Sequence, residues 1–220
     1  MTAAQPGSPD RQGVRTLEVR WIFPGQLAAA VAGWFGRFPA ETKVVQDAYL
    51  LDPDLPGLSV KVRGERALEV KVYRGTPGLL QVAGRARGRL ESWQKWSFPY
   101  GPPGPYGPPG PGHGDPAGWR PVGKRRRISW FPLAGGPARA GVPGPDGEPG
   151  CAVELTEVDA RGEAWWTLGF EAVGPPGALH SELDAAAALV FARALPAGVE
   201  LGVDDSTSYA QWLRRRPGAG

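Results

Sequence analysis

The sequence predicts an α+β domain of seven or eight antiparallel strands and about three helices, and its charge pattern favours closure of the sheet into a tunnel-like β-barrel. Two observations carry this prediction. Short runs of β-forming residues recur every 8–12 residues or so, which indicates hairpins and not parallel crossovers. Along most of these runs, charged side chains also alternate with apolar ones.

The first half of the chain opens with a strand and a helix. Residues 14–23 alternate and are rich in β-formers, and a Pro-Gly pair then breaks the strand. Residues 26–38 place Leu27, Val31 and Trp34 at helical spacing, and Pro39 ends this helix. Four strands are expected next, over residues 42–51, 58–63, 67–73 and 88–98, because turn-forming residues separate these runs.

The second half repeats the strand pattern before it turns helical. Strands are expected over residues 122–131, 151–159 and 163–173, with a short strand over 199–203. Ser181 and Asp184 resemble a capping box, so an Ala-rich helix is expected from Ser181 to about residue 194. Ser206 or Thr207 can cap a last helix over 209–214.

Glycine and proline mark where the domain is interrupted. The chain has 33 glycines and 25 prolines among 220 residues, and they concentrate at about 99–118 and in 132–150. Such segments bury almost no apolar area, so we expect a polyproline-II-like insert at 99–118, a second loop at 132–150, a disordered tail at 1–13 and a short tail at 214–220. One domain then spans 14–213. The insert is a candidate surface for a protein partner.

Composition excludes several classes of protein. No apolar run is long enough to span a membrane, and the N-terminus lacks the features of a signal peptide. The single cysteine, Cys151, excludes a disulfide framework, and we expect it to be a small core residue in a cytoplasmic protein. A net charge of +3 from 25 basic and 22 acidic residues argues against a general nucleic-acid binder.

Paired opposite charges share one face of several strands. Glu18 and Arg20 alternate with Leu17, Val19 and Trp21. The same alternation is seen for Lys61 with Arg63, Glu69 with Lys71, Arg89 with Glu91, and Lys124 with Arg126. These faces could be solvated outer surfaces with routine cross-strand ion pairs. Alternatively, the sheet curls so that they line a lumen, where basic groups would neutralise a polyanion and carboxylates would hold Mg²⁺ or Mn²⁺.

Taken together, these strands resemble the CYTH domains, or triphosphate tunnel enzymes. The family's Glu-x-Glu-x-Lys is similar to Thr16-Leu17-Glu18-Val19-Arg20, and Gln46-Asp47-Ala48-Tyr49-Leu50 follows as expected. Further similarities are Ser59-Val60-Lys61-Val62-Arg63, Leu68-Glu69-Val70-Lys71, Arg89-Leu90-Glu91-Ser92-Trp93 and Lys124-Arg125-Arg126. The ending Ser208-Tyr209-Ala210-Gln211-Trp212-Leu213 resembles the family's Ser-Tyr-x-x-Leu-Leu. The resemblance covers about residues 14–213.

The resemblance implies a basic tunnel that binds a triphosphate or another polyanionic small molecule. Its implied phosphate-binding residues are Arg20, Lys61, Arg63, Lys71, Arg89, Lys124 and Arg126. The implied catalytic residues are Glu18 and Glu91, which together with Glu171 would hold Mg or Mn for hydrolysis. Three acidic positions of the family pattern are occupied here by Thr16, Trp93 and Gly169. These departures favour the alternative of a non-catalytic module that binds an anionic ligand.

Overall fold

The computed structural model describes residues 13–52, 54–64, 67–99, 118–133, 137–141 and 148–215. Most of the Pro/Gly insert, the N-terminal tail and most of the C-terminal tail lie outside these residues, so the expectations for them stay predictions. The helices and strands are β1 (Val14–Pro24), α1 (Ala29–Phe35), β2 (Glu41–Leu50), β3 (Leu58–Arg63), β4 (Ala67–Val82), β5 (Ala86–Pro99), β6 (Trp119–Pro132), β7 (Arg139–Ala140), β8 (Gly150–Ala160), β9 (Glu163–Val173), α2 (Leu179–Val190) and α3 (Tyr209–Arg214).

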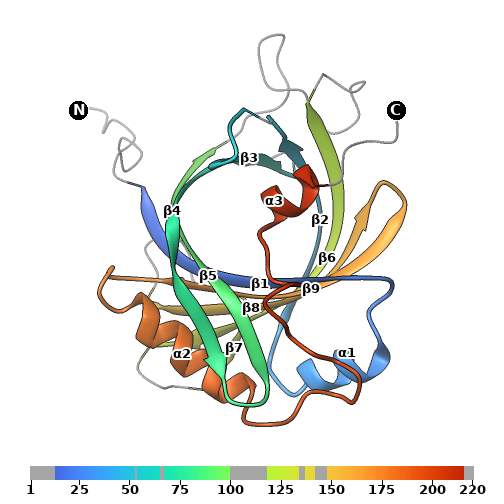
Figure 1. Cartoon of the computed structure of the whole chain (residues 1–220), viewed down its shortest axis with the longest axis vertical. Helices are drawn as coiled ribbons and strands as arrows, with labels where there is room; N and C mark the ends of the chain where they lie inside the picture. The colour runs from blue at the N-terminus through green and yellow to red at the C-terminus, as the bar shows by residue number, and fades with distance from the viewer. Residues whose placement is uncertain are drawn as a thin grey trace, which may run out of the picture.

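Eight antiparallel strands close into a barrel, which confirms the predicted fold class. Their order is β2-β3-β4-β5-β1-β9-β8-β6, and β2 pairs with β6 along its whole length to close the ring. β7 adds a short ninth strand to the outer edge of β6. In Figure 1 the strands form a ring, α1 and α2 lie outside it, and α3 lies within its outline. No helix in the described part of the chain is long and apolar enough to cross a membrane.

Strand β4 is longer than predicted. It continues from Tyr73 to Val82, whereas the expected strand ended at residue 73. Gly75 and Gly78 have positive φ, +125° and +143°, and the register with β5 shifts at each of them. The two glycines therefore allow irregularities within a continuous strand, because backbone of this kind is accessible to glycine at little cost.

Other boundaries also differ from the sequence prediction. α1 covers only 29–35 of the expected 26–38. α2 begins at Leu179 and ends at Val190; Ser181 is not its cap, since its hydroxyl donates to the carbonyl of Ala178 (2.8 Å) inside the first turn. The expected strand 199–203 is reduced to an isolated bridge between Leu201 and Ala86. The loop 132–150 contains β7.

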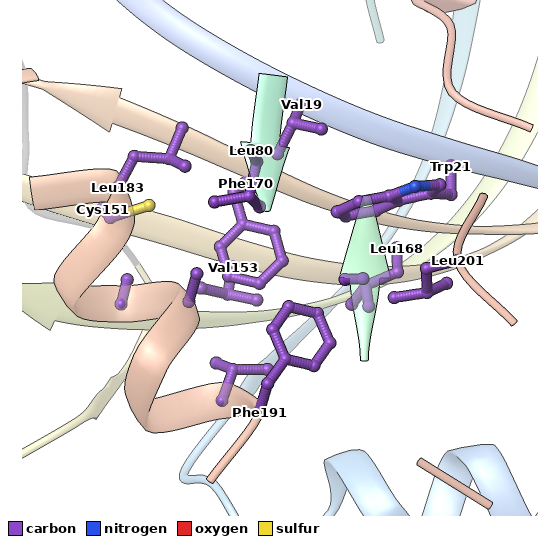
Figure 2. Close-up of a cluster of buried hydrophobic side chains, with 14 of the residues drawn as sticks. Val19, Trp21, Leu80, Cys151, Val153, Leu168, Phe170, Leu183, Phe191 and Leu201 are labelled. Carbon is purple, nitrogen blue, oxygen red and sulfur yellow. The ribbon is translucent and has the colours of Figure 1, made fainter. Parts of the chain in front are cut away.

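The main hydrophobic core lies outside the barrel. Trp21 points away from the lumen and packs edge-on against Phe170 and Phe191, with ring centroids 6.2 and 6.4 Å apart. In Figure 2, Phe170 lies between Trp21 on the right and Leu183 of α2 and Cys151 of β8 on the left. Cys151 is fully buried, as predicted. The apolar faces of β1, β8 and β9 are thus covered by α2 and the segment after it, which leaves their charged faces to line the interior.

A second, smaller apolar cluster closes one end of the lumen. Ile22, Val122 and Trp165 each lie two residues from an inward-facing residue, namely Arg20, Lys124 and Thr167, so they continue the inward faces of β1, β6 and β9. Trp212 and Leu213 of α3 pack against them. The Ser208 hydroxyl caps α3 by accepting a hydrogen bond from the Gln211 amide. The C-terminal helix is therefore a plug in one mouth of the barrel.

Removing the centre of the outer core should destabilise the protein strongly. Phe170 is 1 % exposed, and Phe170→Ala is expected to lower the free energy of unfolding by about 3–5 kcal/mol because it leaves a cavity under α2. Chemical denaturation monitored by circular dichroism measures the change. Leu189→Ala on the outer side of α2, where Leu189 is 51 % exposed, is the control and should cost less than about 1 kcal/mol. Equal losses for the two variants would contradict this placement of the core.

Candidate functional site in the barrel lumen

Every site residue expected from the sequence lines one cavity inside the barrel. The empty space in and around it is about 720 Å³, a volume that includes open solvent. Six strands contribute the predicted residues to its wall: Glu18, Arg20, Lys61, Arg63, Lys71, Arg89, Glu91, Lys124, Arg126 and Glu171. They converge because closure through β2 and β6 turns the charged face of each strand inward. The alternative of solvated outer faces is therefore wrong for these residues, while their chemical roles stay predictions.

Several other residues of the lumen are not among the predicted site residues. Glu154 and Tyr209 also line the cavity, and Asp47 and Glu69 are buried beside its cations. The alternation of β8 places Glu154 two residues before inward-facing Thr156, which is a signal that could have been used. The contacts of Tyr209 depend on where α3 docks, and no local pattern specifies that.

Two carboxylates that are not among the predicted site residues, Glu69 and Glu154, each join a pair of cations. Glu69 Oε2 lies 2.6 Å from Lys61 Nζ and 3.2 Å from an Arg63 guanidinium nitrogen. Burial would raise the pKa of Glu69, but the charges of Lys61 and Arg63 hold that pKa far below its ordinary value. Each set of one carboxylate and two cations keeps a net positive charge. Its cations also retain N–H donors that are not needed by the shared carboxylate.

The second of these carboxylates is Glu154. It accepts from Arg126 Nε at 2.8 Å and from Arg20 at 3.3 Å. Burial opposes its ionisation, but Arg126 and Arg20 hold the pKa of Glu154 well below the ordinary value. Gly169 makes this contact possible. A Cβ at position 169 would lie 2.7 Å from the guanidinium carbon of Arg20, so the absent side chain leaves the path across β9 open.

Three carboxylates form a row across neighbouring strands. Glu18 of β1 is directly opposite Glu91 of β5 and Glu171 of β9. The residues at two expected acidic positions now support this row, because Thr16 donates to Glu18 (2.7 Å) and the indole of Trp93 donates to Glu91 (3.0 Å). Burial and the neighbouring charge of Glu18 raise the pKa of Glu91 to about 7.

Lys124 is the most deeply buried cation of the lumen. Its ammonium donates to Asp47 (2.7 Å) and to the hydroxyl of Tyr49 (2.6 Å), and it lies 4.0 Å from the ring centroid of Tyr209. Burial lowers the pKa of Lys124 to about 7, although the carboxylate of Asp47 works in the opposite direction. The charge of the lumen therefore changes near neutral pH.

Arg89 holds the segment that precedes the plug. Its guanidinium donates to the carbonyls of Val203 (2.8 Å) and Ser206 (3.2 Å), and its backbone amide donates to the Ser206 hydroxyl. Because Arg89 also lines the cavity, it joins the lumen wall to the segment that leads into α3. A change at Arg89 would therefore disturb both.

The predicted metal ligands lie among cations of this chain. Glu18, Glu91 and Glu171 could supply carboxylate oxygens, which Mg²⁺ and Mn²⁺ prefer. However, the ammonium of Lys71 lies 2.6 Å from Glu18 and 3.5 Å from Glu171, and that of Lys95 lies 2.7 Å from Glu171. Among the described residues, no group of three or more His, Cys, Asp or Glu side chains is arranged to hold a metal. The row as it stands does not fit a divalent ion.

Fold and site together define a closed antiparallel barrel with a charged lumen that is plugged at one end by the C-terminal helix. No family model matches the chain, and no curated protein matches it. Among solved structures it is similar to a conserved hypothetical protein, Pfu-838710-001, from Pyrococcus furiosus. The identity is 13 % and the TM-score is 0.43, and the match covers 88 % of this chain and 98 % of that one.

Removing the charge of Glu154 should destabilise the barrel. Glu154→Gln leaves Arg20 and Arg126 without their shared counter-charge in a buried place, and we expect a loss of about 3–5 kcal/mol in the free energy of unfolding. Thermal and chemical denaturation at pH 7 measure it. The control is Glu41→Gln, which removes an ion pair with Lys43 that is more than 40 % exposed on both sides and should cost less than about 1 kcal/mol. A loss no larger than that of the control would show that the two arginines do not depend on Glu154.

Proposed function

We propose that this protein binds a phosphorylated polyanionic small molecule in the lumen of its barrel. The observation that carries the proposal is the convergence of seven cationic side chains, contributed by five strands, on one cavity. Arginine and lysine donors of this kind bind phosphate oxygens through charge-assisted hydrogen bonds, and arginine often does so with two donors at once. The resemblance of the strand motifs to CYTH domains supports the same class of ligand.

The acids of the lumen set the conditions under which a ligand binds. Glu69, Glu154 and Glu171 already partner the cations, so a ligand gains from the donors that these carboxylates leave free. The attraction is electrostatic, and its affinity falls as salt concentration rises. Arg63 is the best placed for first contact, because its side chain is 36 % exposed while those of Lys61 and Lys124 are 11 % and 3 % exposed.

Hydrolysis of a bound triphosphate with Mg or Mn stays a prediction of the resemblance. The ammonium groups beside Glu18 and Glu171 favour binding without turnover, and phosphate release with and without metal tests the point. A protein-interaction role of the insert also stays a prediction, since residues 100–117 lie outside the described part of the chain.

Binding of tripolyphosphate should depend on Arg63. In calorimetry at low salt, Arg63→Ala is expected to weaken the affinity roughly 10- to 100-fold, because it removes a charge-assisted contact. Arg125→Ala is the matched control: Arg125 is exposed on the opposite face of β6 from Lys124 and Arg126, and its loss should change the affinity less than about twofold. If no polyanion binds the wild-type protein, or if both variants lose affinity equally, the lumen is not the binding site.

The affinity for tripolyphosphate should also fall as pH rises from 6 to 8. The pKa of Lys124 is about 7, so Lys124 carries its charge below this pH and loses it above. One proton taken up on binding changes affinity by at most about tenfold per pH unit, and we expect roughly a three- to tenfold decrease over the range.

Lys124→Arg keeps the charge throughout this range, and it also controls for titration of the ligand itself. The variant should show a flatter pH profile in calorimetry, after circular dichroism has confirmed its fold. Identical profiles for wild type and variant would mean that Lys124 does not titrate with binding.

A further inference from the structure

The carboxylate row of Glu91, Glu18 and Glu171 needs a positive charge at its centre. Residues directly opposite each other in an antiparallel sheet have Cα atoms about 4.5–5.5 Å apart, so the three acids are neighbours on one face. Like charges this close, inside a barrel, repel each other strongly unless a cation lies among them.

Lys71 provides that charge. It lies on β4 and reaches over β5, so that its ammonium contacts Glu18 Oε1 at 2.6 Å and Glu171 Oε1 at 3.5 Å. Its side chain is 14 % exposed. Burial works against the charged form, but the carboxylates of Glu171 and Glu18 raise the pKa of Lys71 above its ordinary value. Lys71 therefore carries its charge at neutral pH.

The row also accepts further contacts from this chain. Thr16 donates to Glu18 Oε1 and Lys95 lies against Glu171 Oε1, which are the same two oxygens that Lys71 contacts, and the indole of Trp93 donates to Glu91 Oε2. A divalent ion would have to displace the ammonium of Lys71 and break an ion pair between buried groups, and breaking such a pair is costly. By contrast, an ammonium has three N–H donors, and only two carboxylates share them here. One donor is left for a ligand oxygen.

We propose that Lys71 is the resident cation of the lumen, held between Glu18 and Glu171 where a divalent ion would otherwise lie, and that the lumen therefore takes up phosphate groups without a divalent metal. The statement about the ligand rests on the proposed function. The statement about the cation does not, because it concerns only the affinity of the carboxylate row for a metal ion.

The direct test is binding of Mn²⁺, followed by the loss of the six-line electron paramagnetic resonance signal of the free ion. Wild-type protein in equimolar amount should leave the signal unchanged. Lys71→Ala leaves three carboxylates facing each other, and this variant should take up about one equivalent of Mn²⁺. Adding Glu18→Gln to it should abolish the uptake. Lys43→Ala, which removes a surface lysine paired with Glu41, is the control and should behave as wild type.

A second measurement needs only the wild-type protein. Its affinity for tripolyphosphate, measured by calorimetry in the presence of a chelator, should not become tighter when the chelator is replaced by excess Mn²⁺. This arm decides the question even if Lys71→Ala does not fold.

Two results would overturn the proposal about Lys71. One is uptake of Mn²⁺ by the wild-type protein that is lost in Glu18→Gln. The other is binding of tripolyphosphate that becomes more than about tenfold tighter with Mn²⁺. In either case a polyanion site in the lumen could stand. If instead no phosphate compound binds under any condition, the proposed function fails, while uptake of Mn²⁺ by Lys71→Ala still decides the nature of the resident cation.

Discussion

The structure depends on one electrostatic constraint: charged side chains enclosed in a barrel have to neutralise one another. The lumen of this protein holds acids and bases from all eight strands of the ring, and the cost of removing them from water is met only if each has a partner. Glu69, Glu154 and Glu171 meet this requirement by each joining two cations. The lumen consequently remains positive by a small margin, because the shared carboxylates do not cancel every base.

This constraint also explains why the hydrophobic core lies outside the ring. Residues two apart on a strand share a face, so a strand that turns Glu18 and Arg20 inward turns Leu17, Val19 and Trp21 outward. Those apolar side chains would be exposed to water if α2 and the segment after it did not cover them. Helix packing on the outside and charge pairing on the inside are thus two consequences of the same alternation. Turning a strand over would expose its charged face to the outer core and its apolar face to the lumen.

The C-terminal helix connects the two environments. Trp212 and Leu213 fill one mouth of the barrel, while Tyr209 on the same helix places its ring over Lys124 and 4.5 Å from the guanidinium carbon of Arg20. Arg89 fixes the segment that leads into this helix. A ligand entering the lumen would therefore meet a wall that is built partly by the last residues of the domain, so that plug and binding surface are joined.

Local pattern was sufficient to locate the strands and to state which residues share a face, because alternation with a period of two is a property of a few consecutive residues. It also selected ten residues that meet in one cavity. Local pattern failed at two places. The strand expected over residues 67–73 continues as β4 to Val82, with register shifts at Gly75 and Gly78. At Gly169 the pattern indicated a missing acid, where the glycine leaves space for Arg20. Only tertiary structure decided that the ring closes between β2 and β6, that α3 enters its mouth, and that Lys71 lies between Glu18 and Glu171. These contacts join residues far apart in the sequence, and they form only after the loops between them have closed.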